Sequence, residues 1–283
     1  MLVVPAMKDS PTMIQSKFGL VPAGSVLSYQ QRLDENIVIN IYDGVSFPDL
    51  PVDSLEENSY QTALQSDKSL KKESIHLSLP EITKFEILTR LQNRSSLWFK
   101  LRRDRITASN IGEIFKRRKN EETLVKRLKS TRHVTTAAMR QGIALEPTAA
   151  IDYAKINKNE VNLYPCGLII CSKAPWIAAS PDRKVYNPNR LPPFGLLKIK
   201  CPQVASVIEC KYLMKDGTGQ LKLKRNHNYY YQILTQLAVS GLEWCDLFVW
   251  CTGDSHQETV YFNKDVWSSV KNKIDKFYFD HFI

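Results

Sequence analysis

The chain has 283 residues, 43% of them apolar, and a formal net charge of +10 at pH 7. This length and composition are enough for one large domain or two small ones with a hydrophobic core. No apolar run is long enough to span a membrane, and residues 1–7 lack the charged leader of a signal peptide. We therefore expect no membrane association and an intracellular location, with the nucleus as one option.

The cysteine pattern agrees with that location. None of the six cysteines forms a CxxC pair or has paired histidines nearby, which argues against a zinc site. We expect reduced thiols packed among apolar neighbours. The residues are Cys166, Cys171, Cys201, Cys210, Cys245 and Cys251.

The positive charge is concentrated in one part of the chain. Residues 1–80 carry ten acidic and six basic side chains, whereas residues 98–132 carry twelve basic and four acidic ones. A basic segment of this kind is typical of a protein that binds a polyanion. A solvated helix face has the same composition and remains the alternative.

The first part of the chain shows little regular patterning. Prolines interrupt short apolar pieces such as residues 36–42, and the polar segment 61–73 is typical of a linker. We therefore predict two regions: an N-terminal extension over residues 1–84 that is partly irregular, and a folded domain over residues 85–283.

Helices and strands are predicted in chain order from residue 80 onward. Ser109 precedes an amphipathic run with an acidic first turn and is expected to start a helix. Pro147 is expected to break or kink a helix, and Gly241 to end one. The mixed order favours an α/β or α+β layered domain. The predicted helices are 81–91, 97–101, one starting at 109, 135–156, 229–240 and 266–277, and the predicted strands are 166–171, 176–179, 196–201, 246–251 and 259–262.

Two carboxylates are candidate metal ligands. Asp182 follows Ser180 and Pro181 at the end of an apolar run, and a carboxylate held rigid at a strand end suits a divalent cation. A turn aspartate is the alternative, because Ser-Pro-Asp is also common in turns. Glu146 can supply a second ligand from a helix, or it can be an ordinary first-turn glutamate before Pro147.

Lys198 and Lys200 lie on the same face of a predicted strand because side chains alternate along it. A lysine in an apolar strand is costly to bury unless it is paired, which favours a functional interpretation. Without an acid between them the two ammonium groups repel each other. A metal ion at this place requires carboxylates, whereas a phosphate can be bound by lysines.

Three polar residues are candidates for substrate binding. A serine at a helix N-terminus together with an arginine can hold a phosphate, and Ser109 and Arg102 fit this description. An N-cap serine and a surface arginine are the alternative. Gln232 and Gln236 lie one turn apart on a predicted helix and can face the same cleft.

Five motifs in this order resemble the YqaJ-type viral recombinase and lambda-type phage exonuclease family. The resemblance covers about residues 94–252 and implies a PD-(D/E)xK nuclease: an α/β protein whose restriction-endonuclease-like core is a mixed central β-sheet flanked by helices. The motifs are Trp98-x3-Arg102-x3-Ile106-Thr-Ala-Ser109, Gly142-x3-Glu146-Pro147, Ser180-Pro181-Asp182, Gly195-Leu-Leu-x-Ile-Lys200-Cys-Pro, and Tyr229-Tyr-Tyr-Gln232 followed by Trp244-Cys-Asp-Leu-Phe-Val-Trp250.

The resemblance implies a role for each matching residue. Asp182 and Glu146 would bind Mg²⁺, or Mn²⁺ in its place, and Lys200 would orient or deprotonate the attacking water. Arg102 and Ser109 would bind the 5′-terminal phosphate, and Gln232 would line the cleft. The implied activity is metal-dependent hydrolysis of linear double-stranded DNA from a 5′ end, in recombination or in viral or transposon DNA processing.

The implied partners are double-stranded DNA ends, a single-strand annealing or recombination protein, and a second copy of the chain.

The sequence departs from this family at two positions. Lys198 occupies the glutamate position of the E-x-K motif, and Arg183 stands where glycine is usual. A lysine beside Asp182 removes a metal ligand and repels the cation. Glu209 belongs to a literal E-x-K sequence and is expected to be a surface glutamate, although it could reach in as a replacement ligand.

Two main hypotheses follow, with a third beside them. The protein is a metal-dependent DNA exonuclease impaired at Lys198, or it is a catalytically inactive protein that binds DNA ends. An RNA nuclease is the third.

Overall fold

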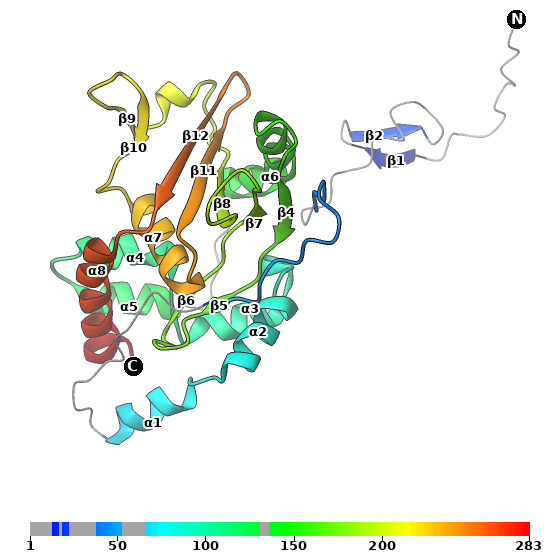
Figure 1. Cartoon of the computed structure of the whole chain (residues 1–283). Helices are drawn as coiled ribbons and strands as arrows, with labels where there is room; N and C mark the ends of the chain where they lie inside the picture. Colours follow the sequence, from blue (N-terminus) through cyan, green and yellow to red (C-terminus); the bar gives the residue numbers. More distant parts are fainter. Residues whose placement is uncertain (1–12, 17–18, 23–37, 53–65, 131–135) are drawn as a thin grey trace, which may run out of the picture.

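A five-stranded mixed sheet runs through the middle of the fold in the computed structural model (Figure 1), which describes residues 13–16, 19–22, 38–52, 66–130 and 136–283. The strand order is β12-β11-β8-β7-β4; β8 and β11 are parallel and the other neighbours antiparallel. The strands are β4 (Asn162–Pro165), β7 (Arg183–Tyr186), β8 (Phe194–Lys200), β11 (Trp244–Trp250) and β12 (Ser255–Tyr261).

The remaining strands form three smaller sheets. In one of them β6 lies between β3, which is parallel to it, and β5, which is antiparallel. The other two are antiparallel pairs. Their strands are β3 (Ile106–Thr107), β5 (Ile169–Ile170), β6 (Ile177–Ala179), β9 (Leu213–Lys215) with β10 (Leu221–Leu223), and β1 (Met13–Ser16) with β2 (Gly19–Pro22).

The helices are, in chain order, α1 (Ser66–Ser74), α2 (Leu79–Leu88), α3 (Ser96–Arg103), α4 (Ala108–Lys116), α5 (Glu121–Lys129), α6 (Ala137–Ile156), α7 (Asn228–Ser240) and α8 (Lys264–Phe277), with short 3₁₀ turns η2 (Gln92–Arg94) and η3 (Val207–Glu209) and a π-helical end η4 (Tyr278–Phe282). Helix α6 continues through Pro147, so the expected break is wrong. Gly241 ends α7 at φ 76°, as predicted, because glycine readily adopts this left-handed conformation.

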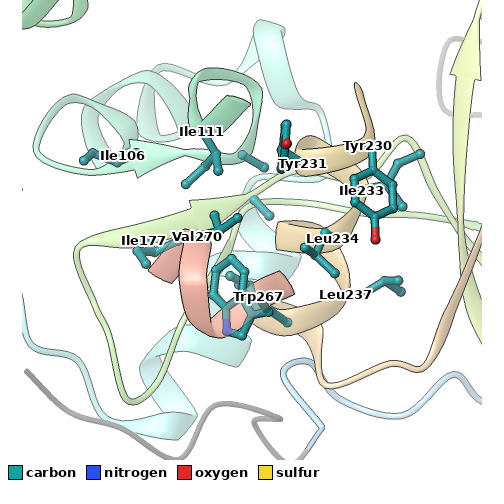
Figure 2. Close-up of a cluster of buried hydrophobic side chains, with 14 of the residues drawn as sticks. Ile106, Ile111, Ile177, Tyr230, Tyr231, Ile233, Leu234, Leu237, Trp267 and Val270 are labelled. Atoms are coloured by element: carbon teal, nitrogen blue, oxygen red, sulfur yellow. The ribbon is translucent and has the colours of Figure 1, made fainter. Parts of the chain in front are cut away.

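The alternation of side chains along β8 gives the sheet two different faces. Leu197 and Ile199 pack with Tyr153 of α6 in one apolar cluster. Leu196, on the opposite face, belongs to the larger core that contains α4, α7 and α8. Figure 2 shows this core, where Ile111, Leu234 and Trp267 come from these three helices. The alternation also places Lys198 and Lys200 on the α7 side.

Gly195 of β8 has a steric role. An added Cβ would lie 2.3 Å from the Trp244 ring on β11, closer than any real contact. Gly195 therefore lets the tryptophan cover the strand.

Residues 38–52 of the predicted extension pack against the domain. The backbone of Ile39 pairs with that of Leu163 on β4, and the Asn162 side chain accepts hydrogen bonds from the backbone of residues 41 and 42. Leu50 is 1% exposed in the main core. The predicted linker over 61–73 is wrong from Ser66, where α1 begins; residues 61–65 lie outside the described residues.

Several predicted elements are confirmed and others need correction. The strands at 176–179 and 196–201 and the last two strands are present, but of residues 166–171 only Ile169 and Ile170 are in a strand. Each of the six cysteines is a free thiol, as expected. Within the described ranges, no helix combines the length and the apolar character needed to cross a membrane.

Candidate active site and nucleic-acid cleft

A cavity of about 1420 Å³ opens between the sheet and the helices α3, α5 and α6. It brings together six of the seven predicted site residues, which come from segments far apart in the sequence. The six are Arg102, Ser109, Glu146, Asp182, Lys198 and Lys200. Gln232 is half-buried on α7 and is not among the described residues that line the cavity.

The turn between β6 and β7 carries Asp182 and is held from two sides. Trp98 of α3 donates its indole N–H to the Ser180 hydroxyl at 2.9 Å. Gln92 donates to the Pro181 carbonyl at 2.8 Å and to the Cys166 carbonyl at 2.8 Å. These bonds fix the backbone before Asp182, so its carboxylate has a defined position.

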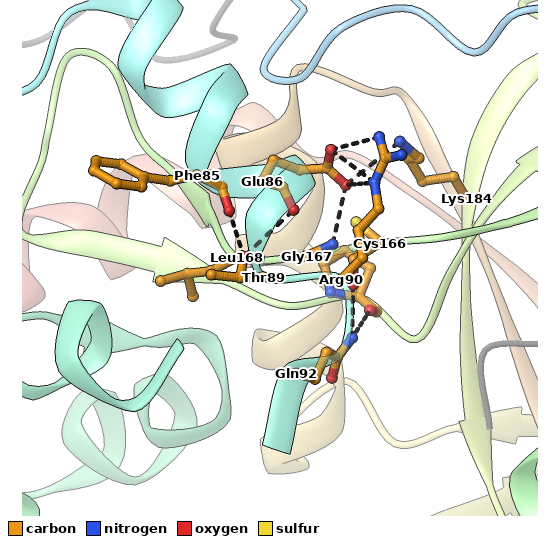
Figure 3. A network of polar contacts seen from close by, with 10 residues as sticks. Phe85, Glu86, Thr89, Arg90, Gln92, Cys166, Gly167, Leu168 and Lys184 are labelled. Carbon is orange, nitrogen blue, oxygen red and sulfur yellow. Dashed lines mark hydrogen bonds and ion pairs between the residues drawn. The ribbon is translucent and has the colours of Figure 1, made fainter. Parts of the chain in front are cut away.

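A buried network around Glu86 holds the neighbouring strand (Figure 3). The Glu86 carboxylate accepts hydrogen bonds from the Arg90 side chain at 2.8 Å and from the Gly167 N–H at 3.0 Å, and Lys184 of β7 lies 3.4 Å away. Burial raises the pKa of Glu86, but these donors outweigh it and keep the pKa below its usual value. The network connects α2 to β7, two residues from Asp182.

Lys198 and Asp182 form a buried ion pair. The Lys198 Nζ atom lies 2.5 Å from Asp182 Oδ1, and the backbone N–H of Ile199 donates to Oδ2 at 2.6 Å. Burial lowers the pKa of Lys198, but the charge and hydrogen bond of Asp182 outweigh it and keep the pKa above its usual value. Lys198 is therefore a cation, and both Asp182 oxygens are engaged.

Arg183 and Glu146 form the second ion pair of the site. Arg183 Nη1 donates to Glu146 Oε1 at 2.7 Å, and the Arg183 side chain is 3% exposed. Burial and the Asp182 charge raise the pKa of Glu146 to about 7, although Arg183 and Lys198 act in the opposite direction. The Arg183 guanidinium is at the carboxylate that was expected to complete a metal site.

Lys200 lies at the edge of these two pairs. Its Nζ atom is 4.1 Å from the centroid of the Tyr229 ring, and no described residue forms an ion pair with it. Burial and the charge of Lys198 lower the pKa of Lys200 to about 7.

The expected Mg²⁺ does not fit this set of residues. Magnesium in proteins is held by carboxylate and water oxygens in near-octahedral geometry. The two carboxylates present, Asp182 and Glu146, each already contact a buried cation. Across the described residues no group of three or more histidine, cysteine, aspartate or glutamate side chains could hold a metal ion. Glu209 is not a replacement, because it is exposed and caps its own 3₁₀ turn through Ser206.

The residues of the predicted phosphate clamp lie close together, but the helix cap differs from the prediction. Helix α4 begins at Ala108 with Thr107 as its N-cap residue, so Ser109 does not cap it but lies exposed in its first turn. The hydroxyls of Ser109 and Thr107 are 3.1 Å apart. The Arg102 guanidinium stacks on Trp98 at 3.9 Å and donates to Thr107 at 3.4 Å. Burial lowers the Arg102 pKa to about 10, which leaves the side chain charged at neutral pH.

Three further residues line the cavity that were not predicted from the sequence as site residues. Tyr229 lines the cavity one turn before Gln232 on α7. Asn110 donates to Thr107 at 3.2 Å. Tyr212 follows the literal E-x-K sequence and lies 5.0 Å from Tyr229 between ring centroids.

Comparisons with known proteins identify the family and the fold of this chain. Residues 97–243 match the family described as YqaJ-like viral recombinase domain. The fold is similar to two crystal structures of LHK-Exo, an alkaline exonuclease from Laribacter hongkongensis. The complex with dAMP is 24% identical with a TM-score of 0.52, and the other structure is 25% identical with a TM-score of 0.50; each match covers 65% of this chain and 90% of the LHK-Exo chain. A search of curated proteins finds no match.

The strand order and the similarity to LHK-Exo confirm the expected restriction-endonuclease-like α/β core. The match to the family spans more than half of the sequence. The chain belongs to the YqaJ-like viral recombinase domain family.

Proposed function

We propose that this protein binds the ends of linear double-stranded DNA in the basic cleft, and that the ion pairs of the cleft impair hydrolysis. The observation that carries this proposal is the lining of the cavity, where nine basic side chains and two carboxylates come from the described residues. Phosphate neutralisation supplies much of the affinity of proteins for DNA. The nine are Lys100, Arg102, Arg103, Arg105, Arg127, Lys129, Arg183, Lys198 and Lys200.

The relationship to phage-type exonucleases supports DNA as the substrate class. LHK-Exo is an alkaline exonuclease by its description, and the present chain covers 90% of its length. Arg102 stacks on Trp98 beside the first turn of α4, and this position supports a role in binding a terminal phosphate.

The ion pairs favour end binding over turnover. Asp182 and Glu146 are the acidic groups of the cavity, and Lys198 and Arg183 contact them directly. A nuclease of this type with its metal ligands neutralised retains the basic cleft that holds the substrate. The impaired exonuclease and the end-binding protein thus share one binding surface.

Binding is tested by fluorescence anisotropy with a 5′-phosphorylated linear duplex, competed by the same sequence as a closed circle. We expect tighter binding to the linear form and a linear fall of log K with log salt. The variant Lys100→Gln/Arg103→Gln removes two exposed charges of the cleft. It should weaken binding and reduce the salt slope by about 2, whereas Lys276→Gln on α8 should leave both unchanged.

Cleavage is tested with the same duplex in Mg²⁺ and in Mn²⁺. We expect the DNA to remain intact in both, and competition with double-stranded RNA to be weaker than with DNA. Degradation of the duplex by the unmodified chain would contradict impairment and support an active exonuclease. Stronger competition by RNA would support the RNA nuclease hypothesis instead.

A further inference from the structure

The two acidic groups of the cleft are each neutralised by a separate buried cation. Asp182 pairs with Lys198 at 2.5 Å, and Glu146 pairs with Arg183 at 2.7 Å. Lys200 adds a third basic group, which forms no ion pair with a carboxylate of the described residues. The five groups lie in one cavity, and with each written in its ordinary ionised form they carry three positive and two negative charges.

This net charge of +1 determines which ligand the site attracts. Buried charges interact strongly because the surroundings screen them little. A divalent cation entering here meets two lysines and an arginine, and it must displace a cation from each carboxylate. A phosphate oxygen, in contrast, is negatively charged and is attracted by the excess positive charge.

Donor groups for a phosphate are available at the same place. An ammonium group has three N–H donors, and Asp182 accepts one from Lys198. Lys200 lies two residues further along the same strand face, above the Tyr229 ring. Both lysines line the cavity together with Arg102, so one DNA strand can contact all three.

We propose that this site binds a DNA backbone phosphate directly, through Lys198 and Lys200, and that Lys198 and Arg183 take the place of a divalent metal ion. The inference rests on the proposed DNA binding and adds that this binding needs no metal. The ligand chemistry is that of a phosphate oxyanion, and the source is the phosphodiester backbone of the bound end.

Metal exclusion is tested by calorimetric titration of Mn²⁺ alone into the full chain. We expect no specific binding. The double variant Arg183→Gly/Lys198→Glu gives the five positions a net charge of −2, and it should bind Mn²⁺. Lys198→Glu alone is the second variant, in case the double variant does not fold by circular dichroism. Specific binding of Mn²⁺ to the unmodified chain would overturn the proposal.

Phosphate binding is tested by measuring affinity for the linear duplex in EDTA and in Ca²⁺ at equal ionic strength. The unmodified chain should bind equally well in both. Lys200→Gln leaves the two ion pairs intact and should weaken binding in EDTA by about ten- to a hundredfold, as expected for the loss of a charged hydrogen bond. Lys276→Gln is the matched control.

The outcomes separate this inference from the proposed function. Absence of any DNA binding would refute the proposed function. Binding that requires Ca²⁺, or that is unchanged in Lys200→Gln, would leave the proposed function standing and refute the phosphate site. If free inorganic phosphate displaces the duplex at low concentration, the site takes a free anion and the assignment to the DNA backbone is wrong.

Discussion

The ion pair between Lys198 and Asp182 is the residue-scale feature on which the account depends. Removing two charges from water is costly, and their attraction compensates only when the geometry and the remaining hydrogen bonds are good. Here the pair is short, and Ile199 satisfies the second carboxylate oxygen. Loss of one partner alone would leave an uncompensated charge in the interior.

We therefore predict that Lys198→Met destabilises the protein by about 3 kcal/mol or more, because Asp182 is left buried without its cation. The double variant Asp182→Asn/Lys198→Met should lose less than the sum of the two single variants, because no charge remains. Urea unfolding of the four proteins gives the comparison. Additive losses would show that the two side chains do not interact.

At the scale of elements, helix α2 fixes strand β7 beside the site. Glu86 on the helix meets Lys184 on the strand, and both side chains are almost fully buried. An added Cβ at Gly167 would lie 1.8 Å from the Glu86 carbonyl oxygen, so the turn before β5 packs directly on the helix.

This contact predicts a pH-dependent contribution to stability. Because the folded-state pKa of Glu86 lies below its usual value, the contribution is present above the unfolded pKa and is lost as pH falls through the folded pKa. Glu86→Gln should cost about 3 kcal/mol at neutral pH, where Lys184 loses its counter-ion, and progressively less in acid.

The measurement is urea unfolding across the acidic range, with the exposed Glu243→Gln as control. A stability difference that is constant with pH would exclude the carboxylate as its source.

The same elements show what the sequence can predict. The predicted strand over 196–201 and the predicted helix over 229–240 were identifiable because their apolar patterns are local. Strand β7 was missed because it begins with Arg183 and Lys184, which are buried only through carboxylates on α6 and α2. Those partners are far away in sequence, so the local polarity does not indicate a buried strand.

Prediction of the site was limited in the same way, because residues that meet in the site are far apart in the sequence. The motifs identified the residues that gather in the cavity, apart from Gln232, which is half-buried on α7 outside the cavity lining while Tyr229 on the same helix lies within it. The sequence also identified Lys198 and Arg183 as departures from the family. It did not show that each contacts a different carboxylate, since that depends on how α6 meets the sheet.

At the scale of the whole molecule, the basic side chains are concentrated around the cavity, a distribution that favours a polyanionic ligand. The basic segment 98–132 forms α3, α4 and α5, and side chains from α3 and α5 line the cavity. In residues 1–80, acidic side chains outnumber basic ones. The chain belongs to the YqaJ-like viral recombinase domain family, while on our proposal the charge at the centre of the fold suits a phosphate better than a metal ion.

The most direct test is a crystal structure of the unmodified protein with a 5′-phosphorylated duplex oligonucleotide and Mn²⁺, with the metal located by its anomalous signal. We predict a backbone phosphate oxygen within hydrogen-bonding distance of Lys198 or Lys200 Nζ, and no manganese between Asp182 and Glu146. A manganese ion coordinated by these two carboxylates, with Lys198 and Arg183 displaced, would contradict the account.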